Sequence, residues 1–248
     1  MIEVRQLKKR FGPQRVLDGV DLRVQKGESI VIIGRSGGGK SILLKHLIGL
    51  LRPEDGDVLI EGQSIARMNE RQLLKLRRKF GMLFQGAALF DSLTVAENVA
   101  FALQREGNLP ENEIARKVDD TLEMVDLAGT QRKKPAELSG GMRKRVGLAR
   151  AIIYQPEIVL YDEPTTGLDP IVADSIDQLI VRIRERLAVT TVAVTHDMRS
   201  ARRIGQRILM LHHGRVHFTG TPEETFQSKD PVVYRFVNGI SDPKEPNF

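Results

Sequence analysis

The residues whose types and spacing are best suited to chemistry form one run, Gly34-Arg35-Ser36-Gly37-Gly38-Gly39-Lys40-Ser41. Its pattern is G-x-x-x-x-G-K-S, in which glycines let backbone N–H groups turn toward an anion. Lys40 adds a positive charge for the β- and γ-phosphates, and the Ser41 hydroxyl can ligate Mg²⁺. The run predicts a site for a nucleoside triphosphate, against the alternative of a glycine-rich loop with an incidental lysine.

Two acidic residues supply a second chemical element. Asp162 and Glu163 directly follow an apolar run that begins at Glu157 and ends at Tyr161. Asp162 is placed to hold a metal ion, directly or through water, and Glu163 is a candidate general base. The alternative is a strand that simply ends in solvated acids. The phosphate-binding run elsewhere in the chain favours the catalytic interpretation.

The segment Leu138–Met142 is a candidate for a second anion site. Ser139 can cap a helix there, and Gly140 and Gly141 expose the backbone behind it. One compact domain has little need for two such sites on one triphosphate. A dimer resolves this, with each nucleotide held between the phosphate loop of one copy and the Ser139 segment of the other. The alternative is an ordinary capped helix, and the residues alone leave both open.

Three further residues are weaker candidates. Gln85 and His196 each follow a predicted strand, so both are expected at the edge where the acids lie. Either residue is also compatible with a purely structural or surface role. Phe11 lies among charged residues and can stack on a base, although core packing is the usual role of a phenylalanine.

The elements that must position these residues follow from hydrophobic periodicity. Ile30–Ile33 predicts a buried strand before the phosphate loop. A helix is predicted after it, with its buried face formed by Ile42, Leu43, Leu44, Leu47 and Ile48. Further strands are predicted at Ile2–Leu7, Val20–Val24, Asp57–Ile60, Phe80–Phe84, Thr190–Thr195, Ile208–Leu211 and Arg215–Phe218.

Helices dominate the stretch from residue 86 to about 151. Thr94–Glu97 is a capping box that opens one helix, and Ser139 caps another. The helix between them is indicated by Ile114, Val118, Leu122 and Val125. Other helices are predicted at Asn69–Arg78, from Pro170 to about Leu187, and after Thr221 and Asp230.

Composition narrows the classes of protein. The 248 residues are 41% hydrophobic, which is enough for a sizeable core. No cysteine is present, so disulfides and thiolate metal sites are excluded and a reducing cytoplasm is expected. We expect no signal peptide, because Met1 leads directly into strand-like residues. No apolar stretch is long enough to span a bilayer.

The net charge of +6 is compatible with a nucleic acid or an anionic lipid as a partner. The basic clusters are short and dispersed, and no helix-turn-helix or zinc-finger spacing is present. We therefore expect no nucleic-acid partner. Any membrane role must act through partner subunits or surface docking.

Taken as a set and in this order, the motifs resemble those of ATP-binding cassette (ABC) transporter ATPases across nearly the whole chain. The Gly34–Ser41 run is similar to Walker A, and Leu138–Met142 to the signature motif. The remaining matches are Gln85 to the Q-loop, Ile158–Asp162 to Walker B, Thr166–Asp169 to the D-loop, His196 to the switch histidine, and Phe11 to the aromatic residue against adenine.

The resemblance implies an α/β P-loop NTPase fold. It has a mainly parallel core sheet, an N-terminal antiparallel β-subdomain and a helical subdomain inserted at about 86–151. The ATPase domain would occupy residues 1–228, and residues 229–248 would form a C-terminal tail that is a candidate dimer contact. ATP and Mg²⁺ are the implied cofactors. Two copies would form a head-to-tail dimer that encloses two ATP molecules and acts on integral membrane permease subunits.

The resemblance also implies roles for single residues. Lys40 would grip phosphate, and Ser41, Gln85 and Asp162 would bind Mg²⁺. Glu163 would polarise the attacking water, and His196 would contact the γ-phosphate. In the dimer, Ser139 would complete the opposite site and Asp169 would link the two sites.

A narrower resemblance points to the ATPases of Mla/Mce-type phospholipid transporters. It is carried by Gln85–Asp91 and by the tail Asp230–Ile240. It implies phospholipid movement between bacterial membranes, with a permease dimer and a lipid-binding Mce-domain protein. The ATPase would lie peripherally on the cytoplasmic face of the inner membrane, and its tail would bind the neighbouring ATPase. Thr166-Gly167 departs from the commoner Ser-Ala form of the D-loop.

Three other functions are alternatives to phospholipid transport. The first is an ABC ATPase for another solute, such as an amino acid. The second is a soluble ABC protein of DNA repair or translation; the chain lacks the long coiled coil of the former and the second cassette of the latter. The third is a nucleotide kinase or GTPase, which would not explain Leu138–Met142, and the Asn-Lys-x-Asp element of a GTPase is absent.

Overall fold

The structure is a computed structural model that describes residues 1–241. It divides into two compact units. The first comprises Met1–Val24, Ser29–Ala66 and the chain from Val194 onward, and the second comprises Gln25–Glu28 and Arg67–Ala193. Across residues 1–241, no helix combines the length and the apolar character that a membrane crossing requires.

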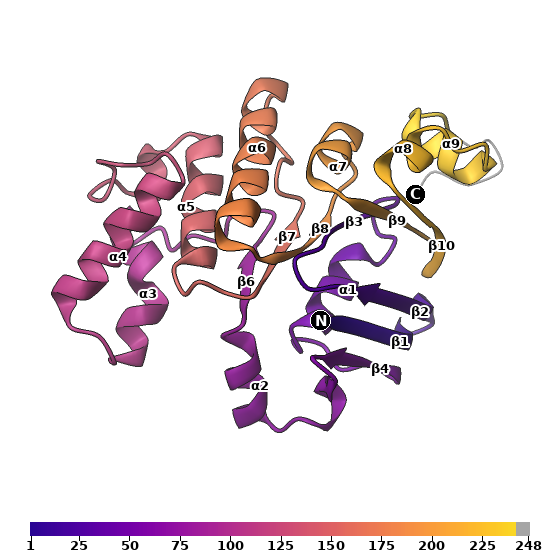
Figure 1. The fold of residues 1–248 in the computed structure, drawn as a ribbon, viewed down its shortest axis with the longest axis horizontal. Helices are drawn as coiled ribbons and strands as arrows, with labels where there is room; N and C mark the ends of the chain where they lie inside the picture. The colour runs from indigo at the N-terminus through magenta and orange to yellow at the C-terminus, as the bar shows by residue number, and fades with distance from the viewer. Residues whose placement is uncertain (242–248) are drawn as a thin grey trace. The chain divides into compact units, whose positions relative to one another are not determined.

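An antiparallel sheet opens the first unit. Its strands are β1 (Ile2–Phe11), β2 (Gln14–Val24), β4 (Asp55–Ile60) and β5 (Gln63–Ser64), in the order β2-β1-β4-β5. All three pairings are antiparallel, and Figure 1 shows β4, β1 and β2 side by side. This confirms the predicted N-terminal antiparallel subdomain. The strands are longer than predicted, because pairing continues through the charged residues up to Phe11.

The rest of the first unit is built on parallel pairing. β3 (Ser29–Ile33) is buried throughout and lies parallel to β9 (Arg207–His212), which pairs antiparallel with β10 (Arg215–Gly220). The helices are α1 (Lys40–Leu47), α7 (Met198–Ile204), α8 (Pro222–Phe226) and α9 (Pro231–Val237). Thr221 and Asp230 cap α8 and α9, as predicted. The sequence did not predict α7.

The second unit contains the strand that carries the acids. β7 (Ile158–Asp162) is fully buried and lies parallel to β6 (Phe80–Leu83), so the carboxyl ends of the two strands lie at the same edge. Two helices flank them in sequence, α2 (Glu70–Arg77) and α6 (Pro170–Leu187). β8 (Thr190–Val194) follows α6 and leads back into the first unit.

Three helices occupy the predicted helical stretch, α3 (Val95–Glu106), α4 (Glu111–Met124) and α5 (Gly140–Ile152). The capping box at the start of α3 is formed by Thr94 and Glu97, as predicted. Contacts of α5 with both α3 and α4 hold the group together, and Figure 1 shows the three helices gathered beside one another. Short 3₁₀ turns lie at Ile65–Arg67 and Pro135–Glu137.

Candidate nucleotide site

The phosphate loop lies between β3 and α1, as its motif requires. Gly34 has φ 150°, and a Cβ there would lie 2.3 Å from the carbonyl oxygen of Leu211, so no larger residue fits. Gly39 has φ 92° and forms the N-cap of α1 without a side-chain hydrogen bond. The backbone alone therefore shapes this helix start, which leaves its positive end directed at the loop.

The side chain of Lys40 closes the loop from within. It is 6% exposed, and its Nζ donates to the carbonyl oxygens of Gly34, at 2.8 Å, and Arg35, at 3.0 Å. Ser41 follows in the first turn of α1 and is half-buried. These groups fit a nucleotide phosphate with Mg²⁺. They are the backbone of the loop glycines, the ammonium of Lys40 and the hydroxyl of Ser41.

Two other predicted residues belong to the same unit. His196 is exposed and follows Thr195, whose backbone N–H donates to the carbonyl oxygen of Ile32 at 3.2 Å. The histidine is thereby held next to the strand that enters the phosphate loop. Phe11 ends β1 and is 47% exposed, with the Lys9 ammonium 5.4 Å from its ring centroid. The core-packing alternative for Phe11 is therefore wrong, because its ring faces solvent.

The acids lie where the strand periodicity predicted them. Asp162 is the last residue of β7, and both it and Glu163 are 8% exposed. The hydroxyl of Thr166 donates to Oε2 of Glu163 at 3.1 Å. Glu163 has φ 51°, a left-handed conformation that is strained for a residue with a side chain. These acids are therefore held in a defined, largely buried position, unlike the solvated acids of the alternative.

Gln85 and Glu163 are connected by a residue that sequence reasoning missed. Lys144 of α5 is 5% exposed, and its Nζ donates to the backbone carbonyls of Gln85 and Glu163. A signal for it exists in the sequence. Lys144 lies three residues after Gly141 and four before Leu148, on the buried face of α5, where a charged residue is unusual.

The Ser139 segment and the D-loop segment lie together. Ser139 caps α5 by accepting from the N–H of Met142, and Asp169 caps α6 by accepting from Ile171 and Val172. A Cβ on Gly140 would lie 3.1 Å from Leu168, and one on Gly141 would lie 2.5 Å from Cγ1 of Val172. The capped-helix role of Ser139 is confirmed. Its role toward a second copy, like that of Asp169, stays a prediction.

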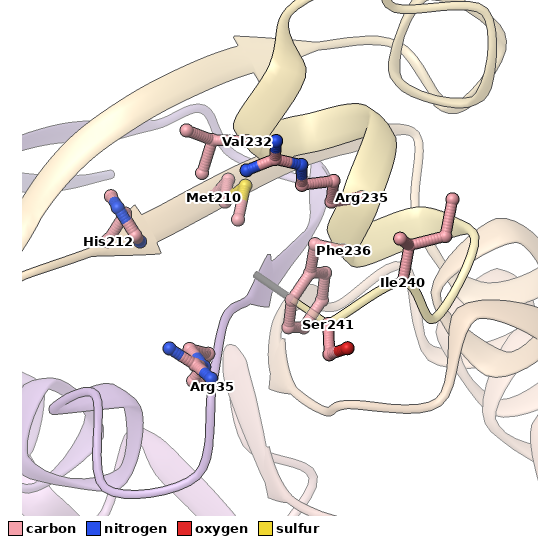
Figure 2. Close-up of a pocket in the computed structure, with 8 residues that line it drawn as sticks. All are labelled: Arg35, Met210, His212, Val232, Arg235, Phe236, Ile240 and Ser241. Carbon is pink, nitrogen blue, oxygen red and sulfur yellow. The ribbon is translucent and has the colours of Figure 1, made fainter. Parts of the chain in front are cut away.

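A small cavity beside the phosphate loop was also not predicted (Figure 2). Its volume is about 70 Å³, and Arg35 lies opposite residues of α9 and the following segment. The lining consists of Arg35, Met210, His212, Val232, Arg235, Phe236, Ile240 and Ser241. The described part of the C-terminal tail therefore reaches the phosphate loop of its own chain.

Comparison with known proteins decides the family. The model of the family described as ABC transporter matches residues 17–166, more than half of the chain. The chain belongs to the ABC transporter family. It has the P-loop ABC ATPase fold and is an ATP-hydrolysing subunit of a transporter. Subunits of this family bind ATP, form dimers and work with membrane permeases.

Two curated relatives are similar over almost the whole chain. The probable ribonucleotide transport ATP-binding protein mkl of Mycobacterium leprae is 43% identical over 96% of this chain and 69% of its own length. The intermembrane phospholipid transport system ATP-binding protein MlaF of Haemophilus influenzae is 41% identical over 98% of this chain and 92% of its own length. The two relatives are named for different substrates.

A solved structure supports the same assignment. It is the dimer of an ATP-binding cassette in a post-hydrolysis state, bound to ADP and phosphate. Its TM-score is 0.82 and its identity 34%, and the match covers 90% of this chain and 99% of that one. The fold class predicted from the motifs is confirmed.

Proposed function

We propose that this ABC ATPase powers phospholipid transport between bacterial membranes. It acts as a head-to-tail dimer on the cytoplasmic face of the inner membrane, bound to a permease dimer and working with an Mce-domain lipid-binding protein. The observation that carries the proposal is the match to MlaF, which extends over 92% of that relative. The Gln85–Asp91 segment and the tail Asp230–Ile240, both similar to this subfamily, support the same substrate.

Within each site, we assign the phosphates to the Gly34–Ser41 loop and to Lys40. Ser41, Gln85 and Asp162 hold Mg²⁺, which when bound neutralises charge on the phosphates. Glu163 orients and polarises the attacking water. Its burial and its hydrogen bond from Thr166 support this role, because both restrict the carboxylate to one position.

The remaining residues act around the nucleotide. The exposed ring of Phe11 stacks on adenine, and His196 contacts the γ-phosphate. Ser139, Gly140 and Gly141 of the second copy complete the site, and Asp169 links the two sites. The proximity of Gly140 to Leu168 supports this last role, because the segments of Ser139 and Asp169 then move together.

We assign the membrane partner to an aromatic groove in the second unit. Its volume is about 660 Å³, and its lining includes Phe84 and Ala88, which lie on either side of Gln85 in the sequence. Five of its fifteen lining residues are aromatic, with Phe84, Phe90, Phe101 and Tyr154 among them. Phe90 is 43% exposed, which suits it for contact with an apolar helix of a permease.

The domain assignment follows the same scheme. Residues 1–228 form the ATPase domain, with a helical subdomain at about 86–151, and residues 229–248 form a tail that contacts the second ATPase. Residues 242–248 of that tail lie outside the described residues.

A second candidate function is transport of another solute. It is favoured by the mycobacterial relative at 43% identity, which is named for ribonucleotide transport.

Gentle membrane extraction followed by affinity capture of the tagged chain tests the proposal. We expect permease subunits and an Mce-domain protein to be retained, with phospholipid bound to them. Phe90→Glu places a charge in the groove and should abolish capture. Leu50→Glu is the control, because Leu50 is similarly exposed, at 49%, but lies outside the groove. We expect it to leave capture unchanged. Capture of a soluble solute-binding protein without bound phospholipid contradicts the lipid assignment.

A further inference from the structure

A buried lysine, Lys144, lies on α5 in the second unit. Nζ of Lys144 donates to the carbonyl oxygen of Glu163 at 3.1 Å and also to that of Gln85. Burial lowers the pKa of this amine, and the charges of Glu163 and Asp162 oppose that shift. Burying a charged amine is costly unless its donors are used, so both carbonyl bonds matter to the fold.

Left-handed backbone occurs at one of these two acceptors, Glu163, and shortly after the other, Gln85. Glu163 has φ 51°, and the residues just after Gln85-Gly86 are two consecutive left-handed alanines, Ala87 at φ 58° and Ala88 at φ 48°. Such conformations are strained for residues with a side chain and persist only when their surroundings hold them. The strained residues lie at or near the two carbonyls that Lys144 binds. We infer that this local backbone geometry is maintained for function.

Helix α5 supplies the support. Arg150, also on α5, donates to the carbonyl oxygens of Ala87, at 2.8 Å, and Ala88, at 2.7 Å. Two cations of one helix therefore hold the backbone that follows β6. Lys144 differs from Arg150 in that it also reaches the backbone of Glu163, at the end of β7.

We propose that Lys144 is a positioning residue for ATP hydrolysis, which fixes the backbone of Glu163 to that of Gln85. This inference rests on the proposed roles of those two residues. When the membrane partner displaces the Gln85 segment, Lys144 transmits the displacement to Glu163 and so moves the carboxylate that activates water. The ammonium acts through the backbone of Glu163 and touches neither water nor nucleotide.

The first test compares two variants of the full chain. Lys144→Met keeps the length of the side chain but removes every donor, and Lys144→Gln keeps an amide donor without the charge. We expect kcat to fall about 10²-fold in the methionine variant and less in the glutamine variant, with KM for ATP within about twofold of the original. An unchanged kcat in Lys144→Met contradicts the proposal, and so does a loss that appears only in KM.

The second test separates positioning from a general loss of structure. Dimers are assembled from two differently tagged copies, one of which carries Glu163→Gln. With Lys144→Met in the copy that keeps Glu163, we expect turnover about 10²-fold below that of the dimer with Glu163→Gln alone. With Lys144→Met in the copy that carries Glu163→Gln, we expect turnover within about twofold of that of the dimer with Glu163→Gln alone. Equal losses in the two arrangements overturn the proposal.

Arg145→Gln is the matched control. Arg145 is the next residue of α5, and its guanidinium binds Val125, Asp126 and Ser175 instead of the carbonyls of Gln85 and Glu163. We expect it to lower the melting temperature while leaving kcat within about twofold. The dimer with Glu163→Gln alone also tests the proposed role of Glu163 separately, because turnover equal to that of the unaltered dimer would show that Glu163 is not the base, whatever residue occupies position 144.

Discussion

Glu163 combines two features that are rarely found in one carboxylate outside functional sites. It is almost fully buried, and its backbone is left-handed at φ 51°. The hydroxyl of Thr166 restricts its side chain, and Lys144 restricts its backbone. At the scale of the residue, therefore, the position of the carboxylate is set by neighbours on two different segments.

We predict that Glu163→Gln lowers kcat by about 10²- to 10⁴-fold, because an amide cannot accept a proton from the attacking water. ATP binding should persist, so the variant should accumulate as an ATP-bound dimer in size-exclusion chromatography. Glu157→Gln is the matched control, since Glu157 precedes the same strand at its other end and pairs with Lys79. An undiminished rate in Glu163→Gln contradicts the assignment of the base.

At the scale of the element, the packing of α5 against α6 explains one glycine of the signature motif. A Cβ at Gly141 would approach Cγ1 of Val172 to 2.5 Å, and Gly141 lies in the first turn of α5, just after the capping residue Ser139. Gly141 is therefore required for close helix packing, in addition to its proposed role in exposing backbone to the nucleotide of a second copy.

We predict that Gly141→Ala lowers the free energy of unfolding by about 1–3 kcal/mol through this overlap. Adding Val172→Ala removes the obstructing methyl group and should restore most of the loss, as measured by urea unfolding. ATP turnover should stay reduced in the double variant, because the added methyl group still covers the backbone that faces the second nucleotide. Full recovery of turnover would show that Gly141 is required only for the packing of α5 against α6.

A helix or strand was predictable where neighbouring residues in the sequence already indicate it. α6 was predicted from Pro170 to about Leu187 because a proline commonly starts a helix, and the structure places Pro170 at its first position. α7 was missed because seven residues, three of them arginine, are too short to show a period. Ile42 was predicted to be inward but is only half-buried, whereas Leu43, Leu44 and Leu47 are buried as predicted.

The site itself was predictable only in part. The phosphate loop and the acids carry their chemistry in contiguous residues, so the sequence identifies them. The bond of Lys144 to Gln85 spans 59 positions of the chain and depends on tertiary packing, so no local pattern contains it. The cavity at Arg35 was missed for the same reason, since its other lining residues lie on β9 and in the C-terminal segment.

At the scale of the whole molecule, two copies are needed to complete each proposed site. The Gly34–Ser41 loop and the Ser139 segment both suit an anion, and a related cassette with ADP and phosphate bound is a dimer. We expect each site to combine Glu163 of one copy with Ser139 of the other. Tail residues up to Ser241 reach the phosphate loop of their own chain, so the proposed contact of the tail with a second copy would act next to that loop.

Complementation in mixed dimers tests this sharing most directly. Ser139→Arg blocks the segment offered to the other copy, and Glu163→Gln silences the site of its own copy. With the two changes in different copies, one site keeps both functional residues, and we expect turnover at about half the original rate. With both changes in one copy, each site has lost one of them, and we expect turnover near zero. The reverse pattern, with activity only when both changes lie in one copy, would contradict the shared site.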